Sequence, residues 1–149
     1  MPVAFRKATT EWQGSATEGN GALTLVSSGA GGPFPVSLTS RADPEDRTQT
    51  NPEELIAAAH SSCYAMALSN VLTQNDTPPN QLDVDVRVTL DKVGEGFGIT
   101  RAELTVVGDV PGIDADSFQS FAEQAEAACP VSNALRGNVE IELQATFVS

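Results

Sequence analysis

The sequence predicts a single α+β domain, residues 1–149, in which mostly antiparallel strands accompany a long central helix. Three observations support this prediction. Residues 51–72 begin with a helix-start signal and contain no charge from Leu55 onward. Residues 82–91 alternate apolar and polar side chains, which is typical of a half-exposed antiparallel strand. Further segments complete the order βββ-α-ββ-α-β, and 149 residues suffice for one core.

Three short segments near the N-terminus read as strands. Residues 3–12, 22–28 and 34–40 are rich in Val, Thr and aromatic side chains, and Gly- and Ser-rich turns separate them. An antiparallel meander is the simplest arrangement of three such strands.

A polar segment, residues 40–50, connects these strands to the central helix. It contains Pro44 and shows no periodicity, so it predicts a loop. Loops at helix entrances often carry functional side chains. Arg41 and Arg47 are therefore candidates, although arginines in such loops are more often simply solvated.

The central helix has a well-specified start at Asn51, a favourable N-cap followed by Pro52 and by Glu54 three residues on. Apolar or small residues occupy every side of the helix, which predicts burial all round. Its length approaches that of a transmembrane span, but its Ser, His and Asn content argues against insertion.

The second half of the chain begins with residues 82–91, which place Leu82, Val84 and Val86 on one face of a strand. A Gly-rich turn leads to a second strand over residues 99–110. A helix over residues 115–128 follows, with a buried stripe formed by Phe118, Phe121, Ala122 and Ala125.

The helix over 115–128 must end before Pro130, whose ring cannot continue it. Pro130 suits the start of a new short helix over residues 131–136, which Gly137 ends. Residues 139–148 then alternate as a last strand that closes the sheet.

Composition limits the possible functions. Eight Lys and Arg against twenty Asp and Glu give a net charge of −12, which disfavours nucleic acid and anionic membranes as partners. The same charge raises the cost of a thiolate, so a reactive cysteine would need a local cation. Residues 1–12 lack the apolar core of a secretory signal, and a cytoplasmic location is expected.

The two cysteines are either inert core residues or a redox couple. A free cysteine usually packs as a small hydrophobe. However, Cys63 lies on the central helix among small residues, and Cys129 lies at a helix start, where unpaired N–H groups favour a thiolate. Two cysteines so placed suggest one that attacks a substrate and one that resolves the product.

Arg41 and Glu53 together could support a thiolate at Cys63, the guanidinium lowering the thiol pKa and the carboxylate holding the guanidinium. Ten helical residues separate Glu53 from Cys63, about 15 Å along a straight helix. Either the helix bends, or a partner subunit supplies Glu53 and Arg41. An equally good explanation for Glu53 is structural, because a carboxylate in the first turn of a helix is stabilised by the helix dipole.

Two motifs, TNPEELIAAAHSSCYAMAL and, far downstream, AACPVSNAL, resemble those of the OsmC/Ohr family (osmotically inducible protein C and organic hydroperoxide resistance protein), and the first is closer to the OsmC branch. The resemblance covers essentially the whole chain in element order. It implies an OsmC-like fold, with sheets wrapped around the buried central helix of an intertwined homodimer.

The resemblance also implies roles for individual residues. Cys63 matches the peroxidatic cysteine, Cys129 the resolving cysteine, Glu53 the carboxylate that orients the arginine, and Arg41 the activating arginine. The loop after Arg41 is longer than usual, which keeps Arg47 as an alternative.

The implied function is a peroxidase that reduces organic hydroperoxides, and hydrogen peroxide less well, without metal, haem or flavin. Cys63 becomes a sulfenic acid, Cys129 condenses with it, and an external dithiol, possibly of lipoyl type, reduces the disulfide. Apolar side chains could line the substrate entrance: Ile56, Met66, Phe118 and Phe121. The alternative is a protein that binds a hydrophobic ligand or senses redox state through the same pocket.

His60 lies one turn before Cys63, so zinc bound by His60, Cys63 and Cys129 is conceivable, but three ligands at this spacing are a weak signal. A buried, hydrogen-bonded histidine is the favoured interpretation, and a role in tuning the thiol is the remaining one. Tyr64 is expected to be a packing residue with a satisfied hydroxyl.

Overall fold

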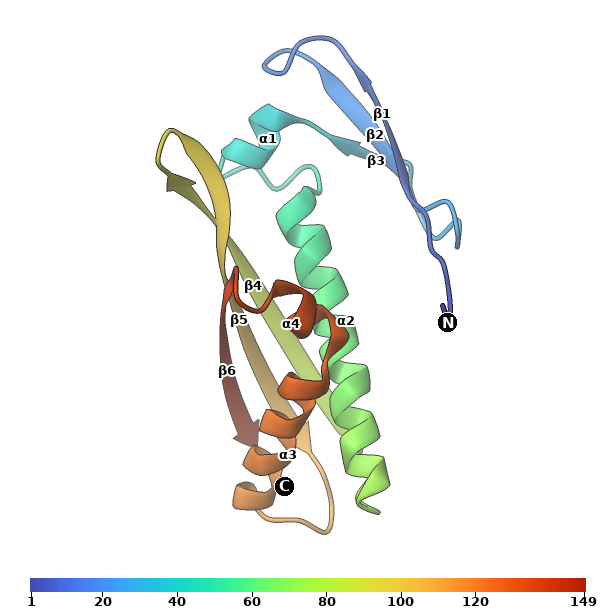
Figure 1. The fold of residues 1–149 in the computed structure, drawn as a ribbon, viewed down its shortest axis with the longest axis vertical. Coiled ribbons are helices and arrows are strands. Elements are labelled where there is room, and N and C mark those ends of the chain that lie inside the picture. The colour runs from blue at the N-terminus through green and yellow to red at the C-terminus, as the bar shows by residue number, and fades with distance from the viewer. The chain divides into compact units, whose positions relative to one another are not determined.

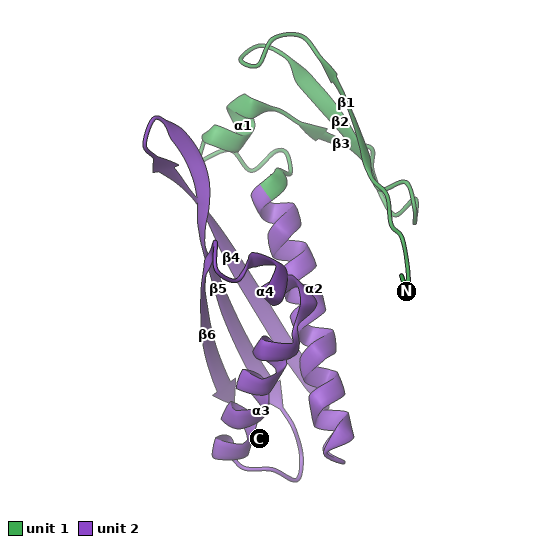
Figure 2. Cartoon of the chain, in the orientation of Figure 1, with its two compact units in different colours: residues 1–52 green, residues 53–149 purple.

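The computed structural model describes residues 1–149, which form two compact units, residues 1–52 and residues 53–149 (Figure 2). Each unit is described by itself.

The first unit contains a three-stranded antiparallel sheet of strands β1 (Thr9–Gln13), β2 (Asn20–Thr24) and β3 (Phe34–Val36). The strand order β1-β2-β3 confirms the predicted meander (Figure 1). Every residue of β1 is exposed in the single chain, including Trp12.

The predicted strand over residues 34–40 is too long, because a short helix, α1 (Leu38–Ala42), follows β3. Ser37 is the cause: its hydroxyl accepts a hydrogen bond from the Ser40 N–H at 3.1 Å and caps the helix. The predicted loop therefore begins after Ala42, and Arg41 lies in the last turn of α1.

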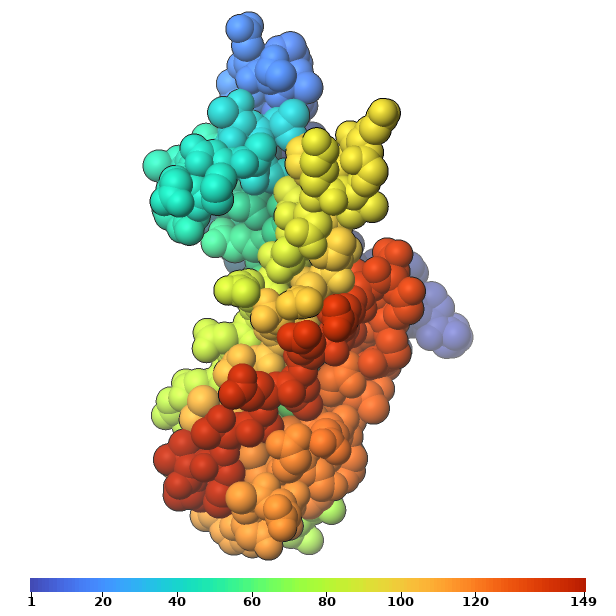
Figure 3. All heavy atoms as spheres, turned by 90° about the vertical axis from the view of Figure 1, so that its left-hand side faces the viewer, coloured from blue at the N-terminus to red at the C-terminus, as the bar shows by residue number.

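The second unit is built on helix α2 (Pro52–Gln74) and a three-stranded sheet. The sheet contains β4 (Gln81–Val93), β5 (Gly96–Asp109) and β6 (Glu140–Phe147) in the order β4-β5-β6. Strand β4 pairs with β5 over its whole length, and its side chains alternate as predicted. Strand β6 pairs with β5 only from Arg101 to Gly108, so the turn end of the β4–β5 hairpin has no β6 neighbour. Figure 3 shows this yellow tip standing clear of the red strand.

Strand β6 runs parallel to β5, unlike the antiparallel pairs of the rest of the fold. Helices α3 (Ala115–Ala128) and α4 (Pro130–Leu135) form the connection between them. A helical crossover of this length returns the chain in the parallel direction. Both helices agree with their predicted positions, and the fold is α+β as predicted.

The core of the second unit lies between α2, α3 and the sheet. It contains these buried residues: Tyr64, Leu68, Leu72, Leu104, Val106, Val110, Phe118, Ala125 and Cys129. By length and composition α2 could cross a membrane, but its buried side chains identify it as the core helix of this unit.

Within one chain α2 is not buried on every side. Between Leu55 and Leu72 its exposed residues are small, uncharged or apolar: Ala58, Ala59, Ser62, Met66 and Asn70. The Met66 side chain is 71% exposed. An uncharged exposed face of this kind is suited to contact with another protein surface.

Gly108 of β5 allows the closest approach between the sheet and α3. A Cβ atom at this position would lie 2.4 Å from two ring atoms of Phe118, which is itself fully buried against the Phe147 ring. We therefore expect Gly108→Ala to lower the free energy of unfolding by about 1–3 kcal/mol.

Urea unfolding measures this loss, and Gly96→Ala is the matched control on the same strand. A Cβ at Gly96 would meet no atom nearer than 4.0 Å, so its effect should stay within about 0.5 kcal/mol. Equal stability of the two variants would contradict the packing described for Phe118.

Candidate active site

The fold brings the two cysteines together, although they are far apart in the sequence. Cys63 lies on α2 and packs against the core cluster that contains Cys129, and the nearby Cys129 thiol raises the pKa of the Cys63 thiol. Both thiols are free, Cys129 is fully buried, and Cys63 is partly exposed. The pair therefore consists of a partly exposed cysteine and a fully buried cysteine that lie close together.

Cys129 lies at the junction of two helices, as predicted from Pro130. It is both the C-cap of α3 and the N-cap of α4. Its backbone N–H donates to the Glu126 carbonyl at 3.4 Å, and its carbonyl accepts from the Asn133 N–H at 3.0 Å. The backbone on both sides of the thiol is thus fixed.

The surroundings of Cys63 do not by themselves favour a thiolate. Burial raises the pKa of the Cys63 thiol, a backbone hydrogen bond from Val131 lowers it, and the neighbouring Cys129 raises it. Since burial is the largest of these effects, a reactive thiolate requires a cation in addition, which agrees with the expectation from the net charge.

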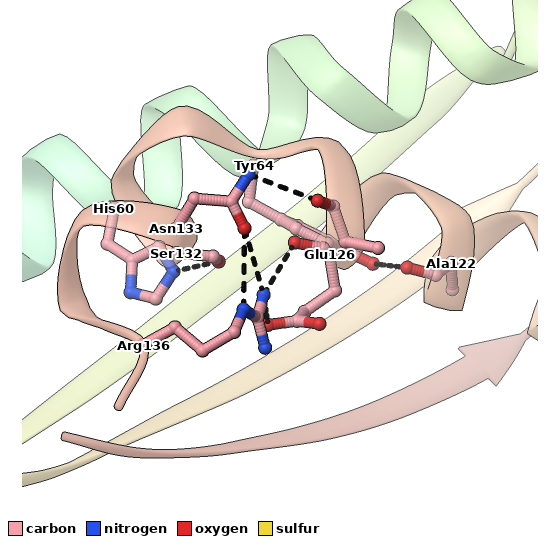
Figure 4. A network of polar contacts seen from close by, with 8 residues as sticks. His60, Tyr64, Ala122, Glu126, Ser132, Asn133 and Arg136 are labelled. Carbon is pink, nitrogen blue, oxygen red and sulfur yellow. Dashed lines mark hydrogen bonds and ion pairs between the residues drawn. The ribbon is translucent and has the colours of Figure 1, made fainter. Parts of the chain in front are cut away.

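A buried hydrogen bond joins α2 to α4 beside the cysteines. His60 Nε2 lies 2.7 Å from Ser132 Oγ, and both side chains are fully buried (Figure 4). Burial lowers the pKa of His60, which keeps the ring neutral, while Glu126 acts in the opposite direction. The prediction of a buried, hydrogen-bonded histidine is confirmed.

Tyr64 also matches its predicted role. It is fully buried, and its hydroxyl donates to the Ala122 carbonyl at 3.0 Å. Burial raises the pKa of Tyr64 far above its usual range, so it is a neutral packing residue.

Across residues 1–149, no group of three or more His, Cys, Asp or Glu side chains is arranged to hold a metal ion.

A polar network on the outer side of the α3–α4 junction was not predicted. The Arg136 Nη2 atom donates to the Glu126 carboxylate at 2.7 Å and to the Glu126 carbonyl at 3.3 Å (Figure 4). Asn133 Nδ2 donates to the Ala127 carbonyl at 3.1 Å. These residues follow no periodic pattern, and only the fold shows that they belong together.

Of the candidate charged residues, Glu53 and Arg41 lie at helix ends, and Arg47 lies in the loop between the two helices. Glu53 is buried in the first turn of α2. Arg41 lies in the first unit, where it lines a cleft of about 370 Å³ together with Trp12, Val36 and Leu38. Arg47 is exposed, and its Nη1 donates to the backbone carbonyls of Pro44 and Asp46.

The four residues predicted to line a substrate entrance differ in exposure. Met66 is exposed on α2, and Ile56 and Phe121 are partly buried. Phe118 is only 1% exposed and packs against Phe147 in the core. Their role toward a substrate stays a prediction.

Comparison with known proteins identifies relatives over most of the chain. Residues 44–144 match the family model described as OsmC-like protein. Peroxiredoxin OsmC of Escherichia coli is 38% identical over 139 residues, which cover 93% of this chain and 95% of that protein. An organic hydroperoxide resistance protein of Xanthomonas axonopodis is 37% identical over 95 residues, 63% of this chain and 65% of that protein.

Solved structures agree with these sequence relatives. The organic hydroperoxide resistance protein of Elizabethkingia anophelis has a TM-score of 0.77 and 27% identity, covering 99% of this chain and all of that chain. OhrB of Bacillus subtilis has a TM-score of 0.73 and 27% identity, covering 94% and 98%. Sequence motifs, fold and paired cysteines lead to the same conclusion: the chain belongs to the OsmC-like family.

Proposed function

We propose that this protein is a cysteine-based peroxidase that reduces organic hydroperoxides to alcohols. The placement of the partly exposed Cys63 beside the fully buried Cys129 carries this proposal. It is supported by the relatives named peroxiredoxin and organic hydroperoxide resistance protein. We propose that residues 1–149 act as one OsmC-like domain, since the E. coli relative is similar over 93% of the chain.

The reaction proceeds in three balanced steps. The Cys63 thiolate attacks the terminal oxygen of ROOH, so that an S–O bond forms, the O–O bond breaks, and RO⁻ takes up a proton to leave as ROH. The Cys129 sulfur then attacks the Cys63 sulfenic acid, which forms the disulfide and releases water. Finally a dithiol supplies two electrons and two protons by exchange and becomes a disulfide itself.

We propose that Arg41 provides the cation that the Cys63 thiolate requires, and that Glu53 orients it. Arg41 is favoured over Arg47, because the family resemblance assigns the role to Arg41 and its side chain lines the cleft with Trp12 and Val36. A homodimer is part of the proposal, with Arg41 and Glu53 supplied by either subunit. The uncharged exposed face of α2 and the exposed strand β1 support a second copy as the partner.

The substrate preference and the reductant belong to the same proposal. Ile56, Met66 and Phe121 would favour an organic hydroperoxide over hydrogen peroxide, since they offer apolar surface and no polar contacts for a small peroxide, while Phe118 packs in the core behind them. A dithiol, possibly of lipoyl type, suits the exchange step. A cytoplasmic location would keep both thiols reduced between turnovers.

The function is tested by mixing reduced protein with one equivalent of cumene hydroperoxide and counting free thiols. A peroxidase loses two thiols per chain rapidly and recovers both with dihydrolipoamide. Thiols that survive for minutes would instead favour the alternative of a protein that binds a hydrophobic ligand. The cleft lined by Trp12, Val36 and Leu38 would then be the place to look for that ligand.

The role of Arg41 is tested by Arg41→Gln. Because burial already raises the pKa of Cys63, loss of the cation leaves less thiolate at pH 7, and each unit of pKa costs about tenfold in thiolate. We expect the first step to slow about tenfold at pH 7 and to recover as the pH rises toward the raised pKa. Stopped-flow rates between pH 6 and 9 measure this, with Arg47→Gln as the control, expected to stay within about twofold of wild type.

A further inference from the structure

The hydrogen bond between His60 and Ser132 joins the two segments that carry the cysteines. His60 lies three residues before Cys63 on α2, so the two side chains lie one turn apart on neighbouring parts of the helix surface. Ser132 lies three residues after Cys129, which caps α4. The contact of 2.7 Å therefore joins α2 to α4 (Figure 4), three residues from a cysteine on each side.

Helix α4 depends on such contacts for its position. It has six residues, and a helix of that length is not stable without packing. Arg136 and Asn133 tie α4 to the end of α3, through Glu126 and Ala127. The His60 contact instead ties α4 to α2, and thus fixes Cys129 relative to the helix that carries Cys63.

The surroundings of His60 indicate a role in positioning rather than in charge. The ring is fully buried, and its Nδ1 atom is buried without a hydrogen-bond partner. Burial removes water from Nδ1 and nothing replaces it, which costs free energy. The hydrogen bond of Nε2 to Ser132 is therefore the polar interaction that holds this ring in place. Since the ring is neutral, it supplies no cation to the thiols.

We propose that His60 and Ser132 are positioning residues for the second step of the reaction, the condensation of Cys129 with the Cys63 sulfenic acid. Disulfide formation requires the two cysteine Cα atoms within about 7 Å and a narrow range of torsion angles. Helix α4 sets the place of Cys129, and the His60–Ser132 hydrogen bond sets the place of α4. The inference rests on the proposed function, because the step exists only in a peroxidase.

The expected effect is confined to one step. Ser132→Ala and His60→Leu each remove the hydrogen bond, and we expect each to slow disulfide formation about tenfold, since small displacements of reacting groups reduce rates strongly. The rate of Cys63 oxidation should fall less than the rate of disulfide formation, because Cys129 is not a reactant in that step and α4 acts on the Cys63 thiol only through its pKa. His60→Gln keeps a hydrogen-bonding group near the Nε2 position and should restore most of the rate.

The experiment mixes each reduced protein rapidly with one equivalent of cumene hydroperoxide and quenches samples over time. Dimedone traps the sulfenic acid, and mass spectrometry of intact protein separates thiol, trapped and disulfide forms. Ser62→Ala is the matched control, because this exposed hydroxyl on the same helix bonds only to carbonyls of α2. The double variant Ser132→Ala/His60→Leu should be no slower than the slower single variant, because both changes break the same contact.

The outcomes separate the two proposals. If wild-type protein loses no thiols, the proposed function itself fails. If wild-type protein forms the disulfide and both Ser132→Ala and His60→Leu form it at the wild-type rate with no trapped sulfenic acid, the positioning role is overturned while the peroxidase stands. Equal slowing of both steps, or failure of His60→Gln to improve on His60→Leu, also overturns it, because either result indicates a general structural role.

Discussion

Cys63→Ser is expected to abolish peroxide consumption, with the largest loss of any single substitution in this chain. A serine hydroxyl is almost entirely protonated near neutral pH and is a far weaker nucleophile than a thiolate. Cys129 cannot take over, since its side chain is fully buried. We expect the rate of cumene hydroperoxide consumption in the presence of dihydrolipoamide to fall at least a hundredfold, to roughly the background rate.

The control for this variant is its stability, because an unfolded chain would also be inactive. Cys63 is partly exposed, and serine is nearly isosteric with cysteine, so the urea midpoint should change little. A folded Cys63→Ser protein that still consumes peroxide would show that another group is the nucleophile, and the proposed mechanism would be wrong.

Cys129→Ser is expected to separate the first step from the second. Cys63 still reduces one equivalent of hydroperoxide, but its sulfenic acid has no thiol partner and accumulates. Excess peroxide then converts it to sulfinic acid, which a dithiol does not reverse. We expect one thiol lost per chain, a trapped sulfenic acid by mass spectrometry, and at least about a tenfold loss of sustained turnover.

The variant should remain folded, because residue 129 is the N-cap of α4 and serine is a preferred residue at that position. Sustained turnover at the wild-type rate would mean that the reductant attacks the sulfenic acid directly. Cys129 would then be a packing residue of the core.

Much of the fold follows from local patterns in the sequence. The alternation from Leu82 onward identifies β4, and Pro130 marks the break between α3 and α4. The parallel pairing of β6 with β5 could not be predicted in the same way, because alternation specifies which face is buried but not the direction of the neighbouring strand. Helix α1 was missed because its only signal is the single capping hydroxyl of Ser37.

The candidate site was predictable only in part. The residues themselves left Cys63 and Cys129 as core residues or a redox pair, and family resemblance assigned their roles. Ser132, Glu126 and Arg136 carry no signal that separates them from surface polar residues. Their partners lie on other elements or several residues away, so they become recognisable only when α3 and α4 are placed beside α2.

The unequal exposure of the two sulfur atoms gives the regeneration step a direction. An incoming thiolate reaches the disulfide at Cys63, so the transient adduct with the reductant forms there and Cys129 departs as the leaving group. The second thiol of the reductant then attacks that adduct and releases Cys63 for the next cycle. For the same reason, a bulky alkylating reagent should label this protein at one cysteine long before the other.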